Sequence, residues 1–515
     1  MSRSNRDASG GIRKDLLTYK ADNATNLGIF ADDYDSIALA IADAKIKGIG
    51  KIYLSAKTYE EPFELSNGIH FVGQGSKLTE IKLPDGANTD LIKTEDFDTL
   101  TGTNKWLVSE GVPTGFGLIG LRVNGNKANN ISGSGVKIYG KRYIIDDVII
   151  IDSAEYGFYS ECAAKAGQEG WDDLPEAYIN RLYTRNSGGD GIVIKGPHDH
   201  RMDFLVSALS GSDGVRFEYL ADTYASSGNV GFIHSYANQG HGVVFEDTVQ
   251  ADQIVGESNV KSGIVINSNK TQISIAYAYQ NDSEDSGLYP DIDLQGANNN
   301  LSNTRIRNTS ASGGIIIAGL GNKLGELEIA GNNTAGVGVD VQANHTQIKA
   351  MIVSDFSAVG GVGLKTGEGV VLDSCQIAGS VLNCETGWDN VTTGKRNKYD
   401  LNIFGTTPQV AFTGQGPASG ESEKWNVNAS VSDVELQTFD RGQVTIPIGT
   451  YYVTVNHKAL ITPLARDITI KPVTDISGGG ITNVWVTNIT TTTFDIRVNT
   501  NVAGVNQQFA WEIRL

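Results

Sequence analysis

Hydrophobic and polar positions follow a short repeat through most of the chain. Each repeat begins with a polar residue, a glycine and an apolar residue. A second apolar residue follows two positions after the first one. Successive glycines lie mostly 21–28 residues apart, with longer steps of 34 and 51 residues. A period of this length predicts short strands that wind into the stacked coils of a parallel β-helix. The repeat glycines are Gly135, Gly157, Gly191, Gly214, Gly242, Gly263, Gly314, Gly336 and Gly361.

The positions after each glycine predict what the coil buries. The first and third are apolar, as in Ile192 and Ile194 or Val215 and Phe217, so we expect them to stack inside the coil. The step of 51 residues is about two periods, and Pro290–Leu294 supplies a degenerate unit within it. Leucine-rich repeats have a similar period, but their Leu-x-x-Leu-x-Leu signature is absent from the sequence.

The N-terminal region has a different pattern. Residues 1–27 are polar and nearly patternless, which predicts a flexible arm or the cut edge of a longer chain. A helix is predicted next, because Asp32 and Asp33 suit its N-terminal cap and Gly48 suits its end. The residues expected on its apolar face are Ile37, Ala38, Ile41 and Ala44.

The repeat stops near residue 396, and residues 415–423 have the composition of a linker. Longer strands with clean alternation follow, such as 494–498 and 509–515, and they indicate an antiparallel, sandwich-like module. The predicted fold class is therefore all-β, a parallel β-helix between a short N-terminal capping helix and this module. The predicted domains are 1–27, 28–395 and 396–515.

Composition and charge exclude several functions. The chain of 515 residues contains 61 glycines and only 11 prolines, and its net charge is −18. Such a charge repels phosphate backbones and anionic membranes, so no nucleic-acid partner is expected. No stretch approaches about 18 uninterrupted apolar residues, so we expect no membrane insertion. Three cysteines cannot form a disulfide framework, and the start of the chain lacks the apolar core of a secretory signal.

The start of the repeat region resembles that of pectate-lyase-type right-handed β-helices. That superfamily has a capping helix followed by Tyr-Leu, Gly-Thr-Tyr and Gly-x-Gly elements. The chain has Tyr53-Leu54, Thr58-Tyr59 and Gly73-Gln74-Gly75, although Lys57 replaces the usual glycine. With its acidic charge and β-rich C-terminal module, the chain resembles a bacteriophage tailspike, and above all the capsule depolymerases of Acinetobacter phages.

The resemblance implies a homotrimer that cleaves a bacterial surface polysaccharide. It also implies a place in the phage tail, with attachment to the virion through an N-terminal part that is missing here. The Arg-x-Pro-x-x-Arg run and the aspartate cluster of calcium-dependent plant-cell-wall lyases are not found in the sequence. We therefore expect no cofactor and no metal ion.

The fourth position after each repeat glycine gives one set of candidate catalytic residues. Glycosidic cleavage usually needs two carboxyl groups, and equivalent positions in neighbouring coils lie about 4.8 Å apart. Glu218 and Glu246 are one coil apart, whereas Glu161 and Glu218 are two coils apart, with Lys195 between them. The alternative interpretation is an exposed ladder of solvated charges. The full column is Tyr139, Glu161, Lys195, Glu218, Glu246, Asn267, Ala318, Asp340 and Lys365.

A second candidate is the segment Pro197–Asp203. His198, Asp199 and His200 could form a metal site, although alternating strand residues point to opposite faces. They could instead line a sugar subsite in which Arg201 binds an acidic sugar, or they could form a polar turn. A histidine base would also suit β-elimination. Further candidates for substrate binding are Tyr159, Arg216, His234 and Tyr236.

A third candidate is the insertion at residues 163–176, which lengthens one coil. Insertions in a solenoid leave the coil as surface loops, and such loops usually line a binding face. Trp171 could stack on a sugar ring while Asp172 or Asp173 reaches the scissile bond. Tyrosines are plentiful in the coils between residues 157 and 280, and as a group they indicate a carbohydrate-facing surface.

The leading hypothesis is a tailspike glycosidase that hydrolyses a capsular polysaccharide or exopolysaccharide with a carboxylate pair. A polysaccharide lyase that acts by β-elimination is the nearest alternative. A binding-only adhesin and a structural spacer whose C-terminal module alone binds glycan are alternatives from other classes.

Overall fold

The computed structural model describes residues 28–100, 112–162, 176–220, 228–308, 310–391, 396–405, 410–414, 424–431, 434–437, 439–457, 459, 462–474, 481–503 and 506–514. The chain divides into two compact units, residues 1–233 and 234–515. The predicted all-β class, with parallel coils, a capping helix and antiparallel C-terminal sheets, is confirmed. Among the described residues, no helix combines the length and the apolar composition needed to cross a membrane.

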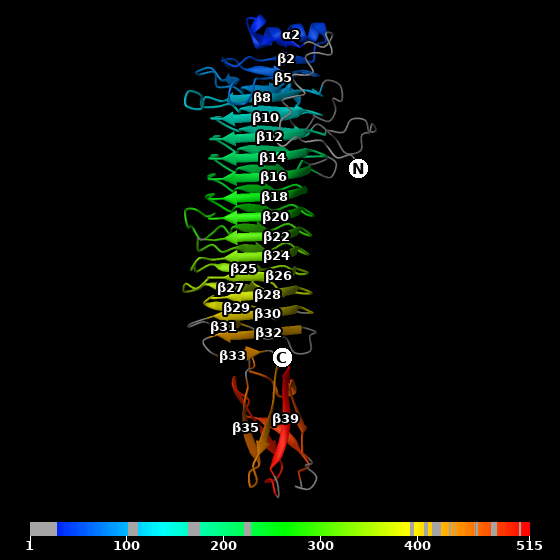
Figure 1. Cartoon of the computed structure of the whole chain (residues 1–515), viewed down its shortest axis with the longest axis vertical. Helices are drawn as coiled ribbons and strands as arrows, with labels where there is room; N and C mark the ends of the chain where they lie inside the picture. The colour runs from blue at the N-terminus through cyan, green and yellow to red at the C-terminus, as the bar shows by residue number, and fades with distance from the viewer. Residues whose placement is uncertain are drawn as a thin grey trace. The chain divides into compact units, whose positions relative to one another are not determined.

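The first unit begins with the 3-10 helix η1 (Ala31–Asp33) and the helix α2 (Ile37–Lys47), which lies beside the first coil in Figure 1. Ser36 is the N-cap of α2 and accepts a hydrogen bond from the Leu39 amide, so the predicted caps Asp32 and Asp33 were wrong. Gly48 ends the helix in the left-handed conformation, as predicted. The buried face is Ile37, Ala40, Ile41 and Ala44, so Ala40 takes the place predicted for Ala38.

Two parallel sheets form the coils of the first unit, and Figure 1 shows β8 to β14 stacked in order. The helix α3 (Phe97–Leu100) lies against β9. Sheet A contains β1 (Ile29–Phe30), β2 (Lys51–Tyr53), β3 (Thr58–Tyr59), β5 (His70–Val72), β6 (Glu80–Lys82), β8 (Gly117–Asn124), β10 (Ile144–Ile151), β12 (Tyr178–Arg185), β14 (Arg201–Ala208) and β16 (Gly228–Tyr236), which crosses the division between the units. Sheet B contains β4 (Phe63–Leu65), β7 (Ile92–Thr94), β9 (Val136–Gly140), β11 (Phe158–Cys162), β13 (Ile192–Lys195) and β15 (Val215–Glu218).

The second unit continues with the same two kinds of strand. Sheet A contains β18 (Val249–Glu257), β20 (Gln272–Tyr279), β22 (Asn300–Arg307), β24 (Lys323–Ala330), β26 (Gln347–Ser354), β28 (Gln376–Leu382), β30 (Lys398–Gly405), β32 (Lys424–Val431) and the antiparallel β33 (Val434–Gln437). Sheet B contains β17 (Val243–Phe245), β19 (Ile264–Ile266), β21 (Ile292–Leu294), β23 (Ile315–Ile317), β25 (Val337–Val341), β27 (Val362–Thr366), β29 (Thr386–Asn390) and β31 (Val410–Gly414). Parallel pairing thus continues beyond residue 396, through β31 and β32.

The repeat glycines are needed because successive coils lie close together at these positions. A Cβ atom on Gly157 would lie 2.5 Å from the carbonyl oxygen of Gly191, which is too close for any side chain. The apolar positions after each glycine are buried, as predicted, for example Ile192, Ile194 and Phe217. These coils therefore place a glycine where there is no room for a side chain, and two apolar side chains inside.

Two of the predicted repeat glycines are two residues out of register. The glycine that stacks on Gly314 is Gly338, because Ile315 pairs with Val339. The next coil continues the stack with Gly363. The sequence offers glycines at both 336 and 338, and at both 361 and 363, so a period-two pattern does not distinguish them.

A ladder of buried amides runs along the second unit. Asn238 Nδ2 donates to Asn259 Oδ1 at 2.8 Å, and Asn259 Nδ2 donates to Asn281 Oδ1 at 2.9 Å. The ladder continues to Asp291, where Asn281 Nδ2 donates to Oδ1 at 2.7 Å. Ile264 pairs with Ile292, so Asp291 stands beside Gly263, in the degenerate unit predicted for this coil.

The C-terminal module consists of two antiparallel three-stranded sheets. They are β34–β39–β36 and β35–β38–β37, and together they enclose one hydrophobic core. Phe494, Ile496, Phe509 and Ile513 are buried in this core, as their alternation predicts. The strands are β34 (Phe439–Ile446), β35 (Tyr452–Asn456), β36 (Ile468–Pro472), β37 (Val484–Thr487), β38 (Thr493–Val498) and β39 (Gln507–Arg514), and η4 (Ala465–Asp467) precedes β36.

Candidate active site

A column of polar side chains crosses sheet B in the first unit. Tyr139 pairs with Glu161, Glu161 with Lys195, and Lys195 with Glu218. The predicted alignment of the fourth position after each glycine is therefore confirmed for these four residues. Neighbouring parallel strands lie about 4.8 Å apart, which places the backbones of Glu161 and Glu218 about 9–10 Å apart.

The two glutamates of this column have different environments. Glu161 is 2 % exposed and accepts a hydrogen bond of 3.0 Å from the Tyr159 hydroxyl. The column neighbour Tyr139 belongs to an apolar cluster with Phe97, against which Tyr159 packs. Low polarity of this kind favours the protonated form of a carboxyl group. Burial thus favours the protonated form of Glu161, whereas the Tyr159 hydroxyl and Lys195, its neighbour in the column, favour the carboxylate.

Glu218 lies closer to solvent and to a positive charge. Its side chain is 29 % exposed, and Oε2 lies 3.8 Å from Lys195 Nζ. A neighbouring ammonium group favours the ionised carboxylate. Glu218 therefore has the surroundings of a general base. The column thus holds one buried and one partly exposed carboxyl group, and acid–base cleavage of a glycosidic bond uses two carboxyl groups in different environments.

Arg216 lies in the adjacent column and is held by two aspartates. Its guanidinium forms an ion pair with Asp213, and Nε lies 3.4 Å from Asp190 Oδ2. Asp190 Oδ1 also accepts a hydrogen bond of 2.9 Å from the Asp213 amide. These aspartates were not among the sequence candidates. The signal that could have identified them is the Asp-Gly pair that precedes each of the strands β13 and β15.

Two tyrosines lie against this charged group. The rings of Tyr156 and Tyr159 are 5.4 Å apart, and Phe97 packs edge-on against Tyr159 at 6.1 Å. Burial, followed by the negative charge of Glu218, raises the pKa of Tyr159 well above its usual range. The pKa of Tyr156 is raised mainly by burial and then by Asp190 and Glu218. Both phenols are therefore neutral hydrogen-bond donors, and their rings offer faces for a sugar.

The segment around His198 lies partly in an exposed turn and partly in the core. His198 Nε2 lies 3.5 Å from Asp199 Oδ2 in the turn after β13, and Asp199 adopts a positive φ of 52°. His200 is fully buried, donates a hydrogen bond of 2.9 Å from Nδ1 to the His198 carbonyl oxygen, and packs edge-on against Tyr143. Burial lowers the pKa of His200 to about 4. His200, which was predicted to line a sugar subsite, is therefore a neutral residue of the core.

Arg201 opens strand β14 and points to solvent on sheet A. Its side chain is 64 % exposed, and Nε lies 3.2 Å from Asp203 Oδ1. The guanidinium also lies 5.8 Å from the centre of the Tyr178 ring, whose hydroxyl donates to Asp203 at 2.9 Å. The predicted role of Arg201 in sugar binding stays a prediction. Within the described ranges, no three His, Cys, Asp or Glu side chains are grouped as a metal site.

The remaining candidates belong to the second unit or to undescribed residues. His234 Nε2 lies 3.2 Å from Glu257 Oε2, and its ring is 4.8 Å from that of Tyr236. Glu246 follows strand β17 in the second unit, whereas Glu218 belongs to the first, so the predicted Glu218–Glu246 pair stays a prediction. Trp171, Asp172 and Asp173 lie outside the described residues.

A tyrosine and arginine surface covers part of sheet A in the second unit. Tyr277 pairs with Arg305, and Tyr279 pairs with Arg307. The two tyrosine rings are 5.9 Å apart and nearly parallel, and both arginines are exposed. Arg305 Nε lies 3.3 Å from Glu328 Oε2 in the next coil. The carbohydrate-facing surface predicted for the tyrosines of the middle coils stays a prediction.

Sheet B of the second unit carries a further pair of carboxyl groups. Asp293 and Asp340 both pair with Ile316, so they lie two coils apart. Burial raises the pKa of each aspartate, and each accepts a hydrogen bond from a glutamine two residues later in the chain. The fourth-position count places Asp340 beside Ala318, but the register places it beside Ile316. The count differs because it starts from Gly336, whereas the glycine that stacks on Gly314 is Gly338.

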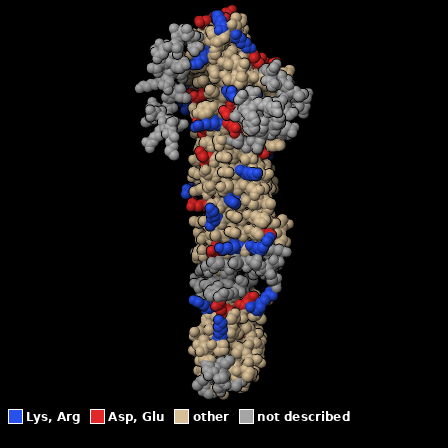
Figure 2. All heavy atoms as spheres, turned by 90° about the vertical axis from the view of Figure 1, so that its right-hand side faces the viewer, with Lys and Arg blue, Asp and Glu red and all other residues tan. Residues whose placement is uncertain are grey.

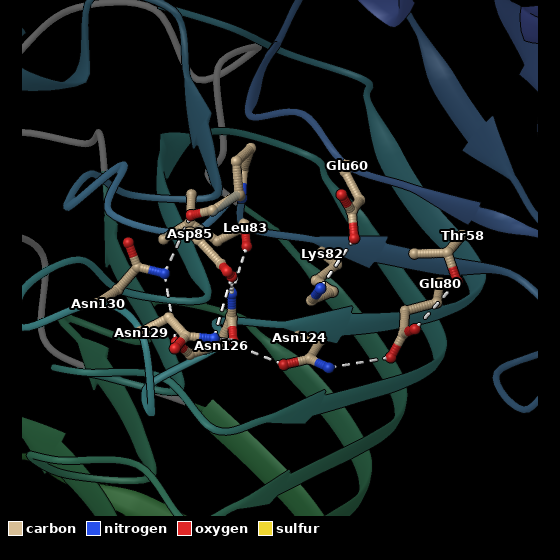
Figure 3. Close-up of polar contacts among 11 residues, drawn as sticks. Thr58, Glu60, Glu80, Lys82, Leu83, Asp85, Asn124, Asn126, Asn129 and Asn130 are labelled. Atoms are coloured by element: carbon tan, nitrogen blue, oxygen red, sulfur yellow. Dashed lines mark hydrogen bonds and ion pairs between the residues drawn. The ribbon is translucent and has the colours of Figure 1, made fainter.

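Figure 3 shows a polar network in the first coils that has a structural role. Asn126 Nδ2 donates to the Leu83 carbonyl at 2.9 Å and to Asp85 at 2.7 Å, and Asn129 Nδ2 donates to Asp85 at 3.0 Å. Asn124 joins this turn to Glu80 on the neighbouring strand. These groups satisfy one another and close the turn after β8.

Figure 2 shows acidic and basic side chains scattered among uncharged ones on the face that it presents.

Comparison with known proteins gives matches to solved structures. No protein-family model matches the chain, and no curated protein matches it significantly. The N-terminal fragment of bacteriophage phi29 gene product 12 is 13 % identical, with a TM-score of 0.52, over 82 % of this chain and 75 % of the fragment. At this identity the match shows a shared fold.

Two tailspikes match nearly the whole chain at lower TM-scores. One is the tailspike of Acinetobacter baumannii bacteriophage AP22, solved in complex with A. baumannii capsular saccharide. It is 8 % identical, with a TM-score of 0.41, and 99 % of each chain is covered. The other is the tailspike of Pseudomonas phage LKA1, 10 % identical with a TM-score of 0.45, over 98 % of this chain and 95 % of that one.

Proposed function

We propose that the protein is a phage tailspike enzyme that binds and depolymerises a bacterial capsular polysaccharide or exopolysaccharide. The substrate class comes from the resemblance of the repeat region to tailspike depolymerases. The observation that carries the chemistry is the register of Glu161, Lys195 and Glu218 in one column of sheet B. The proposal includes a homotrimer and a place in the phage tail, both from the same resemblance.

The proposed reaction is hydrolysis with Glu161 as general acid and Glu218 as general base. Glu161 gives its proton to the leaving glycosidic oxygen, and the Tyr159 hydroxyl continues to donate to Glu161 Oε2, which stabilises the carboxylate that forms. Glu218, kept ionised by Lys195, takes a proton from the water that attacks the anomeric carbon. The C–O bond to the leaving sugar breaks as the new C–O bond to water forms. A spacing of about 9–10 Å is near the upper limit for inversion, so we expect an inverted product.

β-Elimination is the second candidate, and one observation favours it. Lys195 and Arg216 lie on neighbouring strands of sheet B, and the carboxylate of a uronic acid that displaced their present carboxylate partners would be neutralised by both cations. Neutralisation of that carboxylate makes the proton at the adjacent carbon easier to remove. Elimination leaves an unsaturated sugar that absorbs in the ultraviolet, whereas hydrolysis consumes water and leaves a saturated one.

The deciding experiment treats purified capsule with the protein and follows polymer size, new reducing ends and ultraviolet absorbance together. Glu161→Gln and Glu218→Gln are each expected to lower the rate by about 10²–10⁴-fold, as for loss of a general acid or base. Glu64→Gln, an exposed position on β4 of the same sheet, is the matched control and should retain activity. Unchanged polymer size with retained binding would identify a glycan-binding adhesin instead.

A further inference from the structure

A hollow of about 530 Å³ lies on sheet A of the first unit, away from the strands that carry Glu161 and Glu218. Its floor is the outer side of β10, β12 and β14, and its wall is the turn at residues 74–78. Volumes of this size are typical of small-molecule sites. The residues that give the hollow its chemical character are Lys77, Leu78, Asp147, Arg181, Tyr183 and Phe204.

The floor of the hollow presents aromatic surface to solvent. Phe204 is 40 % exposed, although its ring stacks on Phe232 at 5.0 Å and 17°. Leu78 in the wall is 61 % exposed, and Tyr183 lies on the adjacent strand β12. The stack on Phe232 fixes the Phe204 ring, and the remaining face of Phe204 is the aromatic platform of the hollow. A platform of this kind suits the apolar C–H face of a pyranose ring.

Polar groups at the rim are already fixed in place. Arg181 Nη2 lies 2.8 Å from Asp147 Oδ1, which also accepts a hydrogen bond of 3.0 Å from the Ser76 hydroxyl. Asp147 adopts a positive φ of 52° within β10. Arg181 pairs with Phe204 across the strands, so its guanidinium lies next to the platform. Its side chain is 59 % exposed, which leaves further N–H groups facing solvent.

The charge of the hollow is positive in a chain of net charge −18. Lys77 and Arg181 contribute two positive charges, and Asp147 contributes one negative charge. A local excess of cations attracts an anionic ligand, and a guanidinium binds a carboxylate with two parallel hydrogen bonds. The combination of a flat aromatic floor with a guanidinium at its edge is suited to a sugar ring that carries a carboxylate.

We propose that this hollow is a second, non-catalytic saccharide site that binds a uronic acid unit. The ring stacks on Phe204, and its carboxylate pairs with Arg181 and Lys77. The inference rests on the proposed function only for the choice of a saccharide as ligand. On a polymeric substrate, the site holds one part of the glycan on sheet A while another part is cleaved at sheet B.

Direct binding tests this site independently of cleavage. The probes are methyl β-glucuronide and methyl β-glucoside, which differ in the carboxylate, and the measurement is saturation-transfer NMR with titration. We expect the glucuronide to bind more tightly than the glucoside. Phe204→Ala should weaken glucuronide binding by about tenfold, and Lys77→Gln should reduce the preference for the glucuronide. Phe30→Ala, an exposed aromatic on β1, is the matched control and should bind as the unmodified chain does.

The outcomes separate this inference from the proposed enzyme. If glucuronide binding depends on Phe204 but the protein does not shorten capsule, the saccharide site is supported and the proposed depolymerase activity is contradicted. Capsule cleavage with equal glucuronide binding by the unmodified chain and Phe204→Ala overturns the site, as does the absence of binding to either glycoside. If the protein cleaves capsule and also binds the glucuronide through Phe204, Phe204→Ala should raise KM for the polymer and leave kcat unchanged. Circular dichroism and the melting temperature confirm that each variant is folded.

Discussion

Asn281 Nδ2 donates a hydrogen bond of 2.7 Å to Oδ1 of Asp291, at the coil where an aspartate stands in place of the repeat glycine. Asp291 is 1 % exposed, and within the described part of the chain its Oδ2 has no hydrogen-bond partner. Burial raises the pKa of this carboxyl to about 7, although the hydrogen bonds from Asn281 oppose the shift. The amide ladder therefore ends on a group that gains or loses a proton near neutral pH.

We predict that Asp291 makes the stability of the second unit depend on pH. The folded pKa is above the unfolded value of 3.8, so the folded chain binds the proton more tightly. The contribution of this proton to stability is complete below about pH 4 and is lost as the pH rises towards 7. Asp291→Asn keeps the acceptor for Asn281 and cannot ionise. We expect this variant to melt at a higher temperature than the unmodified chain at pH 8, and at nearly the same temperature at pH 4.

The control for this prediction is Asp252→Asn, at an exposed position of the same unit. It removes one negative charge without touching the ladder. An equal rise in melting temperature at pH 8 for both variants would assign the effect to net charge and contradict the role of Asp291.

The stacking of coils could be predicted because the repeat has a physical cause. A glycine is required where a Cβ atom would lie only about 2.5 Å from the neighbouring coil, and the two inward positions after it must be apolar. These requirements are enough to place Glu161, Lys195 and Glu218 in one column from the sequence alone. The prediction was wrong at Gly336 and Gly361, because a second glycine two residues later satisfies the same period of two.

The surroundings of each polar side chain could not be predicted in the same way. His200 lies in a turn, where alternation no longer tells which side chains point inward, and the structure buries it against Tyr143. Asp190 and Asp213 occupy the polar position of the repeat, and their shared contact with Arg216 depends on distances between coils. The hollow beside Phe204 depends on a turn more than a hundred residues earlier in the chain.

Lys195 is predicted to set the acidic limb of the pH–activity profile. Its ammonium lies 3.8 Å from Glu218 and favours the ionised base. Lys195→Met keeps the aliphatic part of the side chain and removes the charge. We expect the limb to move to higher pH, with activity at alkaline pH largely retained. Activity lost equally at every pH would instead make Lys195 a direct contact of the substrate.

Arg216 is predicted to be more important for folding than its partial exposure indicates. Asp190 and Asp213 are both buried, and the guanidinium is close to both carboxylates. Removal of one partner from a buried ion pair typically costs about 3–5 kcal/mol, because the remaining charge is left in a medium of low polarity. Arg216→Ala should therefore lower the melting temperature of the first unit. The triple variant with Asp190→Asn and Asp213→Asn should recover most of that loss, and failure to recover it would contradict the electrostatic explanation.

The repeat glycines allow a sharper test of the coil geometry, because two nearby glycines differ in the space around them. A Cβ on Gly157 would lie 2.5 Å from the Gly191 carbonyl oxygen, whereas the nearest atoms to a Cβ on Gly189 are 3.6 Å away. Gly157→Ala must push neighbouring coils apart, and we expect it to lower the free energy of unfolding by about 1–3 kcal/mol or more. Gly189→Ala should change it by less than about 1 kcal/mol, since alanine only restricts the unfolded chain there. Equal melting temperatures for the two variants would show that the tight approach between coils at Gly157 is not what selects glycine.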